Sequence, residues 1–178
     1  MKLAEVRIRN FRCYRNEFSI SFDALTCIIA KNDTGKSSVL EALEGFFNLE
    51  KLDAEDRSAG AANAEPIEIT CIFDNIPITL IVDSDASISP NNEYLLNSDG
   101  RLEIKKRFLG AAAKCEEIHV KAVHPTAQNF NDLFTLTIAQ LRARAQLLGI
   151  DLTGINQTVK SAIRHAVEFR RNLTHLAQ

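Results

Sequence analysis

The chain has 178 residues, 46% of them apolar and 25% charged, with a formal net charge of −2. This length is typical of one domain or of part of a larger one, and the near-neutral charge provides no general attraction to nucleic acid or to a membrane surface. The four cysteines form no CxxC pair, which argues against zinc and for reduced thiols. Neither an apolar signal core nor a membrane-length apolar run is present, so we expect a cytoplasmic protein with no membrane partner.

The chain begins with two segments that alternate between apolar and polar residues. Residues 3–9 place Ala4, Val6 and Ile8 on one side, and residues 18–22 alternate apolar residues with serines. This alternation predicts a pair of half-buried strands. Residues 25–29, LTCII, are short and almost continuously apolar, which predicts a central strand covered on both faces.

Residues 30–38, AKNDTGKSS, resemble the phosphate-binding (Walker A) loop of P-loop ATPases. They lead into apolar residues at positions 39, 40, 43, 46 and 47, whose helical spacing predicts an amphipathic helix. A helix N-terminus favours phosphate through its free N–H groups and its partial positive charge. The loop therefore predicts binding of ATP and Mg²⁺.

Each polar residue of such a loop has a defined task. Gly35 lets the backbone pass close to the ligand, Lys36 reaches the β- and γ-phosphates as the catalytic residue, and the Ser37 hydroxyl holds Mg²⁺. The predicted nucleotide-binding residues of the loop are Ala30, Lys31, Asn32, Asp33, Thr34, Gly35, Lys36, Ser37 and Ser38.

Ala30 stands where the usual loop pattern begins with glycine. If this position requires a positive φ, an alanine there is strained by about 1–2 kcal/mol. If the position is extended, at the end of the preceding strand, the cost is close to zero. We favour the extended backbone, because the other three requirements of the loop are met.

The middle of the chain changes to a β pattern without intervening helices. Residues 54–64 are small and polar and predict a mobile loop. An antiparallel sublayer is predicted over about 66–108, from alternation at 67–73, an apolar run at 78–82, and a hairpin that pairs 93–97 with 101–108. Gly100 is suited to the positive φ of that hairpin turn.

The C-terminal part returns to helical spacing. Apolar residues from 133 to 148 predict one helix that stops at Gly149, and a last helix is predicted to carry Val159, Ile163, Ala166 and Val167 inward and Lys160, Arg164, Arg170 and Arg171 outward. We expect an ATP-binding part at 1–115 and a helical segment at 116–178. Because the last helix runs to the final residues without a stop signal, we also expect a truncated sequence.

Residues 3–47 resemble the N-terminal part of the ABC-type ATPase heads of the OLD, RecF and SMC group. The resemblance rests on the Asn10-Phe11-Arg12-Cys13-Tyr14 stretch after the first strand, on the loop at 30–38, and on Leu40-Glu41-Ala42-Leu43. The KNDTGKSS form of the loop is nearest to OLD nucleases and related anti-phage ATPases. The resemblance implies an α/β P-loop NTPase fold of ABC-head type, with a mixed sheet, an antiparallel sublayer and C-terminal helices.

In that group two heads sandwich ATP and rearrange around DNA, so the resemblance implies a homodimer or higher oligomer and a DNA partner. It also implies that Arg12 lies near the nucleotide, where a guanidinium can bind phosphate with two nitrogens. The alternative is that Arg12, like Arg7, Arg9 and Arg15, belongs to the solvated face and edge of a β-ribbon.

ABC-type hydrolysis also requires an apolar strand that ends in Asp-Glu, which is not present in clean form. The nearest match is residues 80–83, where Asp83 is a weak candidate for Mg²⁺, as are Asp53 and Asp56 after the first helix. We therefore expect an ATP-binding segment with a role in DNA repair or anti-phage defence. ATP hydrolysis is expected to need a second half of the ATPase, missing here, which carries the Walker B strand and the signature loop. The alternatives are a non-catalytic module that binds a partner protein, and a complete small P-loop NTPase that uses Asp83.

Overall fold

The computed structural model describes residues 1–29, 31, 35–83 and 86–175 of the chain. The chain divides into two compact units, Met1–Val123 and His124–Gln178. The predicted division at residue 115 falls within a strand of the first unit, β7 (Lys114–Lys121). Each unit has its own core of buried apolar side chains.

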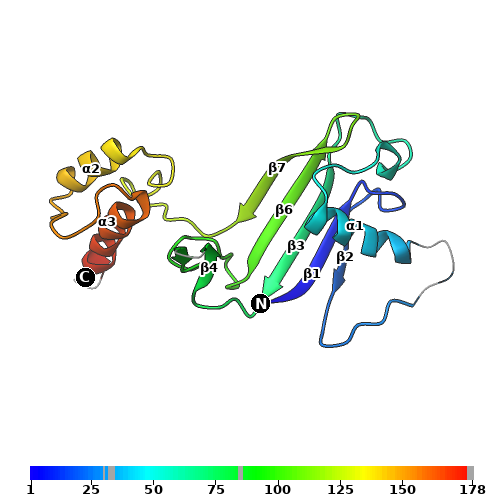
Figure 1. Cartoon of the computed structure of the whole chain (residues 1–178), viewed down its shortest axis with the longest axis horizontal. Helices are drawn as coiled ribbons and strands as arrows, with labels where there is room; N and C mark the ends of the chain where they lie inside the picture. Colours follow the sequence, from blue (N-terminus) through cyan, green and yellow to red (C-terminus); the bar gives the residue numbers. More distant parts are fainter. Residues whose placement is uncertain (30, 32–34, 84–85, 176–178) are drawn as a thin grey trace. The chain divides into compact units, whose positions relative to one another are not determined.

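The first unit is built on a five-stranded sheet in the order β2-β1-β3-β6-β7, and each pair of neighbours is antiparallel (Figure 1). Its other strands are β1 (Lys2–Arg9), β2 (Phe18–Ser21), β3 (Ile67–Asp74) and β6 (Leu102–Leu109). The alternation at 3–9, 18–22 and 67–73 is thereby confirmed as β-structure. One face of the sheet is apolar because the side chains alternate across the strands.

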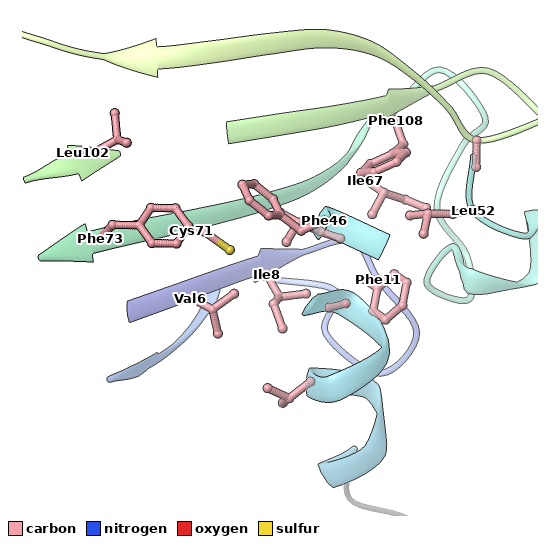
Figure 2. Close-up of a cluster of buried hydrophobic side chains, with 14 residues drawn as sticks. Val6, Ile8, Phe11, Phe46, Leu52, Ile67, Cys71, Phe73, Leu102 and Phe108 are labelled. Carbon is pink, nitrogen blue, oxygen red and sulfur yellow. The ribbon is translucent and has the colours of Figure 1, made fainter. Parts of the chain in front are cut away.

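Helix α1 (Lys36–Asn48) packs against β1 and β3 and covers the apolar face (Figure 2). Its buried residues are Ser38, Val39, Ala42, Gly45 and Phe46. Two of the apolar residues at helical spacing, Leu40 and Phe47, are 63% and 54% exposed, although the Phe47 ring still meets Phe73 with centroids 6.2 Å apart. The residues that α1 buries are shifted by about one position from the predicted apolar residues. The reason is that small Ala42 and Gly45 allow the helix to approach the sheet closely.

The strand predicted over residues 25–29 is not formed. These residues carry no β pairing, and Leu25 and Ile29 are 85% and 91% exposed. A strand needs a neighbour, and β1 already has β2 on one side and β3 on the other. The predicted mixed sheet is corrected accordingly: within the described residues, both sheets are antiparallel.

The hairpin of β6 is also different from the predicted one. Residues 93–97 form no strand, and β6 pairs instead with β7, which the sequence pattern did not reveal. The turn at 97–100 is confirmed, with Gly100 at φ 72°. β4 (Leu80–Asp83) pairs with β5 (Ala86–Ile88) in a separate two-stranded sheet, and residues 54–64 contain a short 3₁₀ helix, η1 (Ala54–Asp56).

The second unit consists of α2 (Ile138–Leu147), α3 (Lys160–His175) and their connections. Its buried core is Leu133, Leu141, Ala145, Ile163 and Val167. The outward orientation predicted for Arg164 is wrong. Its side chain is 8% exposed, lies 3.7 Å from the Glu168 carboxylate, and stacks over the Phe134 ring at 4.1 Å.

Thr137 begins α2 with a capping box. Its hydroxyl oxygen accepts from the Gln140 N–H at 3.3 Å, and the Gln140 carboxamide oxygen accepts from the Thr137 N–H at 2.8 Å. We expect Thr137→Ala to lower the free energy of unfolding of the second unit by about 1 kcal/mol. Faster amide hydrogen exchange in the first turn of α2 would show this loss, whereas unchanged exchange would mean that the cap contributes nothing.

Candidate functional site

The candidate site lies at the N-terminus of α1, where the sequence predicts a phosphate loop. Gly35 is the N-cap residue with φ 92° and ψ 12°, and the first turn of the helix carries no acidic side chain. Of the predicted loop residues, the structure describes Lys31 and residues 35–38. Ala30, Asn32, Asp33 and Thr34 lie outside the described residues.

Lys36, Ser37 and Ser38 occupy different environments in the first turn of α1. The Lys36 ammonium donates to the Lys31 carbonyl at 2.7 Å, so the side chain folds back along the loop. Ser37 is exposed, whereas Ser38 is buried. A cation and an exposed hydroxyl at a helix N-terminus are the groups that a magnesium-bound polyphosphate requires.

A tight turn after β1 lies directly beside this helix end. Phe11 and Tyr14 exchange backbone hydrogen bonds of 3.2 and 2.8 Å, and Arg12 inside the turn has φ 49°. The Tyr14 hydroxyl donates to the Gly35 carbonyl at 3.0 Å, and its ring stacks on Phe18 with centroids 4.6 Å apart. Burial raises the pKa of Tyr14, so the hydroxyl stays protonated and remains a donor at neutral pH.

Gly35 is required here for two independent reasons. Its φ lies in the left-handed region, which side chains other than glycine rarely adopt. In addition, a Cβ at this position would lie 2.4 Å from the Cys13 sulfur and 3.0 Å from the Tyr14 hydroxyl oxygen. Residues 11–14 therefore pack directly against Gly35, which leaves no space for a side chain at position 35.

Arg12 lies between two carboxylates. Its Nε donates to Asp56 Oδ1 at 2.8 Å and its backbone N–H donates to the Asp56 carbonyl at 2.6 Å. Its Nη1 pairs with Glu41, a residue of α1. The guanidinium therefore lies next to the first turns of α1, and Arg12 joins three segments that are distant in the sequence.

Of the three candidate magnesium ligands, Asp53 and Asp56 lie together at η1, whereas Asp83 lies on β4. Asp56 is buried, and its second oxygen accepts from the Asp53 N–H at 3.1 Å, so both of its oxygens are used within the protein. Asp53 is exposed at the start of η1, and Asp83 belongs to the two-stranded sheet. Among the described residues, no three His, Cys, Asp or Glu side chains are grouped so that they could hold a metal ion.

A magnesium ion at α1 would therefore rely on Ser37 and on phosphate oxygens. This donor set fits Mg²⁺, which usually keeps several waters and binds through few protein ligands together with substrate phosphates. The site residues that sequence reasoning missed are Tyr14 and Glu41. Tyr14 stands two positions after Arg12 in the stretch that carries the family resemblance, which is the only sequence signal for its role.

No helix in the described part of the chain has the length and apolar character needed to cross a membrane.

Comparisons with known proteins give this chain a relative and a family. The chromosome partition protein Smc of Methanococcus voltae is 30% identical over 95 residues, which cover 48% of this chain and 8% of that protein. The chain thus spans less than a tenth of the length of this relative. A family model described as the AAA ATPase domain matches residues 1–176. Because this match covers nearly the whole sequence, the chain belongs to the AAA ATPase domain family.

Proposed function

We propose that this chain is the ATP-binding segment of an ATPase of the OLD, RecF and SMC group. The observation that carries the proposal is the N-terminus of α1, where Gly35, Lys36 and Ser37 meet the turn at 11–14. In this proposal ATP drives the association of two heads, and that association regulates DNA processing in repair or in anti-phage defence. The similarity to an Smc protein supports the link to DNA.

Each residue of the site has its own role toward a bound nucleotide. Magnesium-bound ATP supplies a γ-phosphoryl group open to attack by water. Lys36 leaves the Lys31 carbonyl to neutralise charge on the phosphates, and the first N–H groups of α1 donate to the phosphate oxygens. Ser37 holds the ion, and Tyr14 keeps the Gly35 backbone in place.

Hydrolysis needs residues beyond this site, and the exposed apolar side chains around α1 support this part of the proposal. Leu40 and Phe47 of α1 are 63% and 54% exposed, although the Phe47 ring also meets Phe73 of β3, and Leu25 and Ile29 precede the loop in an unpaired apolar segment. A helix with apolar residues on two faces is typical of a helix packed between two layers. We propose that the second layer carries the carboxylates that position magnesium and the attacking water.

A second candidate function is a non-catalytic module that retains the ATPase fold to bind a partner protein. The observation in its favour is Ala30, which replaces the first glycine of the loop, together with the absence of an Asp-Glu strand end. Assembly that does not depend on nucleotide would support this alternative. Assembly that requires ATP would support the ATP-binding head.

Nucleotide titration of the wild type, Lys36→Ala and Lys51→Ala tests the proposal. Lys51 is an exposed lysine just after α1, so its substitution removes the same charge without touching the loop. Loss of a charge-assisted contact with phosphate is expected to weaken ATP binding about 30-fold in Lys36→Ala and to leave Lys51→Ala close to the wild type. Equal affinity in all three proteins, or no binding by folded wild type, would refute the ATP site.

A further inference from the structure

The carboxylates around Arg12 differ in how firmly the fold holds them. The Asp56 side chain is 11% exposed, and its two oxygens accept from Arg12 Nε and from the Asp53 N–H. The Glu41 side chain is 43% exposed and belongs to the second turn of α1. Asp56 is therefore a fixed part of the fold, whereas Glu41 meets Arg12 through one ion pair from a partly exposed side chain.

The backbone holds Arg12 in the same place. Arg12 donates its N–H to the Asp56 carbonyl, and the next two residues contact Gly35, Cys13 by close approach and Tyr14 through its hydroxyl. A guanidinium has a planar set of donors, so fixing Nε at Asp56 also fixes the direction of its outer nitrogens. One of these nitrogens, Nη1, meets Glu41 beside the helix end that carries Lys36.

We infer that Asp56 is a positioning residue that holds Arg12 toward the phosphate site, and that Glu41 occupies the place at this guanidinium that a nucleotide phosphate takes. The inference rests on the proposed function and assigns Asp56 a role other than magnesium binding. On nucleotide binding, Arg12 keeps its Asp56 contact and exchanges Glu41 for a phosphate oxygen. An exposed ion pair contributes little stability, so this exchange has a low energetic cost.

The two carboxylates should therefore act on nucleotide affinity in opposite directions. Asp56→Asn removes the charge that fixes Arg12 and is expected to weaken ATP binding about fivefold. Glu41→Gln removes the competing carboxylate and is expected to tighten ATP binding about threefold. A purely structural role for either residue would not produce opposite signs.

A double-mutant cycle on the full chain separates this inference from a general loss of stability. ATP affinity is measured for each carboxylate variant with Arg12 present and with Arg12→Ala, and thermal unfolding is recorded for every protein. Both effects should disappear in the Arg12→Ala background. The matched control is Glu65→Gln, which removes the ion pair of Arg15, a contact of 2.6 Å that does not involve Arg12.

Effects that persist without Arg12, or that equal those of Glu65→Gln, overturn the inference while the ATP site stands. Weaker binding by Glu41→Gln also overturns it. If wild-type protein that unfolds cooperatively binds no ATP, and Lys36→Ala behaves in the same way, the proposed function fails and this inference fails with it.

Discussion

Gly35→Ala is expected to weaken ATP binding more than tenfold and to lower the free energy of unfolding of the first unit by about 2–4 kcal/mol. Part of the cost is backbone strain, since φ is 92° at this residue. The rest comes from contact, because the new Cβ would lie 2.4 Å from the Cys13 sulfur. The Cys13 side chain must then rotate away, and the Tyr14 hydroxyl, 3.0 Å from the new Cβ, must shift from its contact with the Gly35 carbonyl. Denaturant unfolding and ATP titration measure the two effects.

Gly60→Ala is the matched control for this prediction. Gly60 has φ 79°, so its alanine variant carries similar backbone strain, but a Cβ there meets nothing within 4 Å. We expect it to cost about 1 kcal/mol in stability and to leave ATP affinity unchanged. If the two variants lose the same stability and bind ATP equally well, the close approach at Gly35 has no functional consequence.

Arg164→Ala is expected to lower the free energy of unfolding of the second unit by about 3–5 kcal/mol. The substitution removes the guanidinium that pairs with the Glu168 carboxylate, whose side chain is 9% exposed, and that stacks on Phe134. Removing a cation from beside a buried carboxylate is costly, since little water reaches the carboxylate. Amide hydrogen exchange in α2 and α3 reports this unit separately from the sheet.

Two further variants test the cause of that loss. Arg142→Ala removes an exposed arginine from α2 and should change stability by less than about 0.5 kcal/mol. The double variant Arg164→Met with Glu168→Leu replaces the ion pair by apolar volume and should recover most of the stability. A double variant as unstable as Arg164→Ala would show that packing, and not the buried charge, dominates.

Local patterns predicted the elements that depend on few neighbours. Alternation over residues 3–9 and 67–73 identified β1 and β3, because one buried face imposes a period of two on a strand. The Gly-Lys-Ser spacing before a helical pattern identified α1 and the N-terminus at which phosphate binding is proposed. In these cases the pattern that predicts the element lies within a few consecutive residues.

Elements that depend on distant partners were not predicted correctly. Residues 25–29 have the composition of a central strand, yet they have no strand to pair with in the described part of the chain. β6 pairs with β7 and not with residues 93–97, because the choice between two polar-apolar segments depends on which of them lies at the open edge of the sheet. Helical spacing placed Arg164 outside, but Glu168 and Phe134 provide a buried site for it.

The amino-acid sequence by itself determined the family and the helix that presents Lys36 and Ser37, because these depend on residue type and on short spacing. Only the tertiary structure decided what surrounds that helix end. Arg12, Tyr14, Glu41 and Asp56 meet there because β1 and α1 pack together and η1 follows, and contacts between residues up to 44 positions apart leave no periodic trace in the sequence.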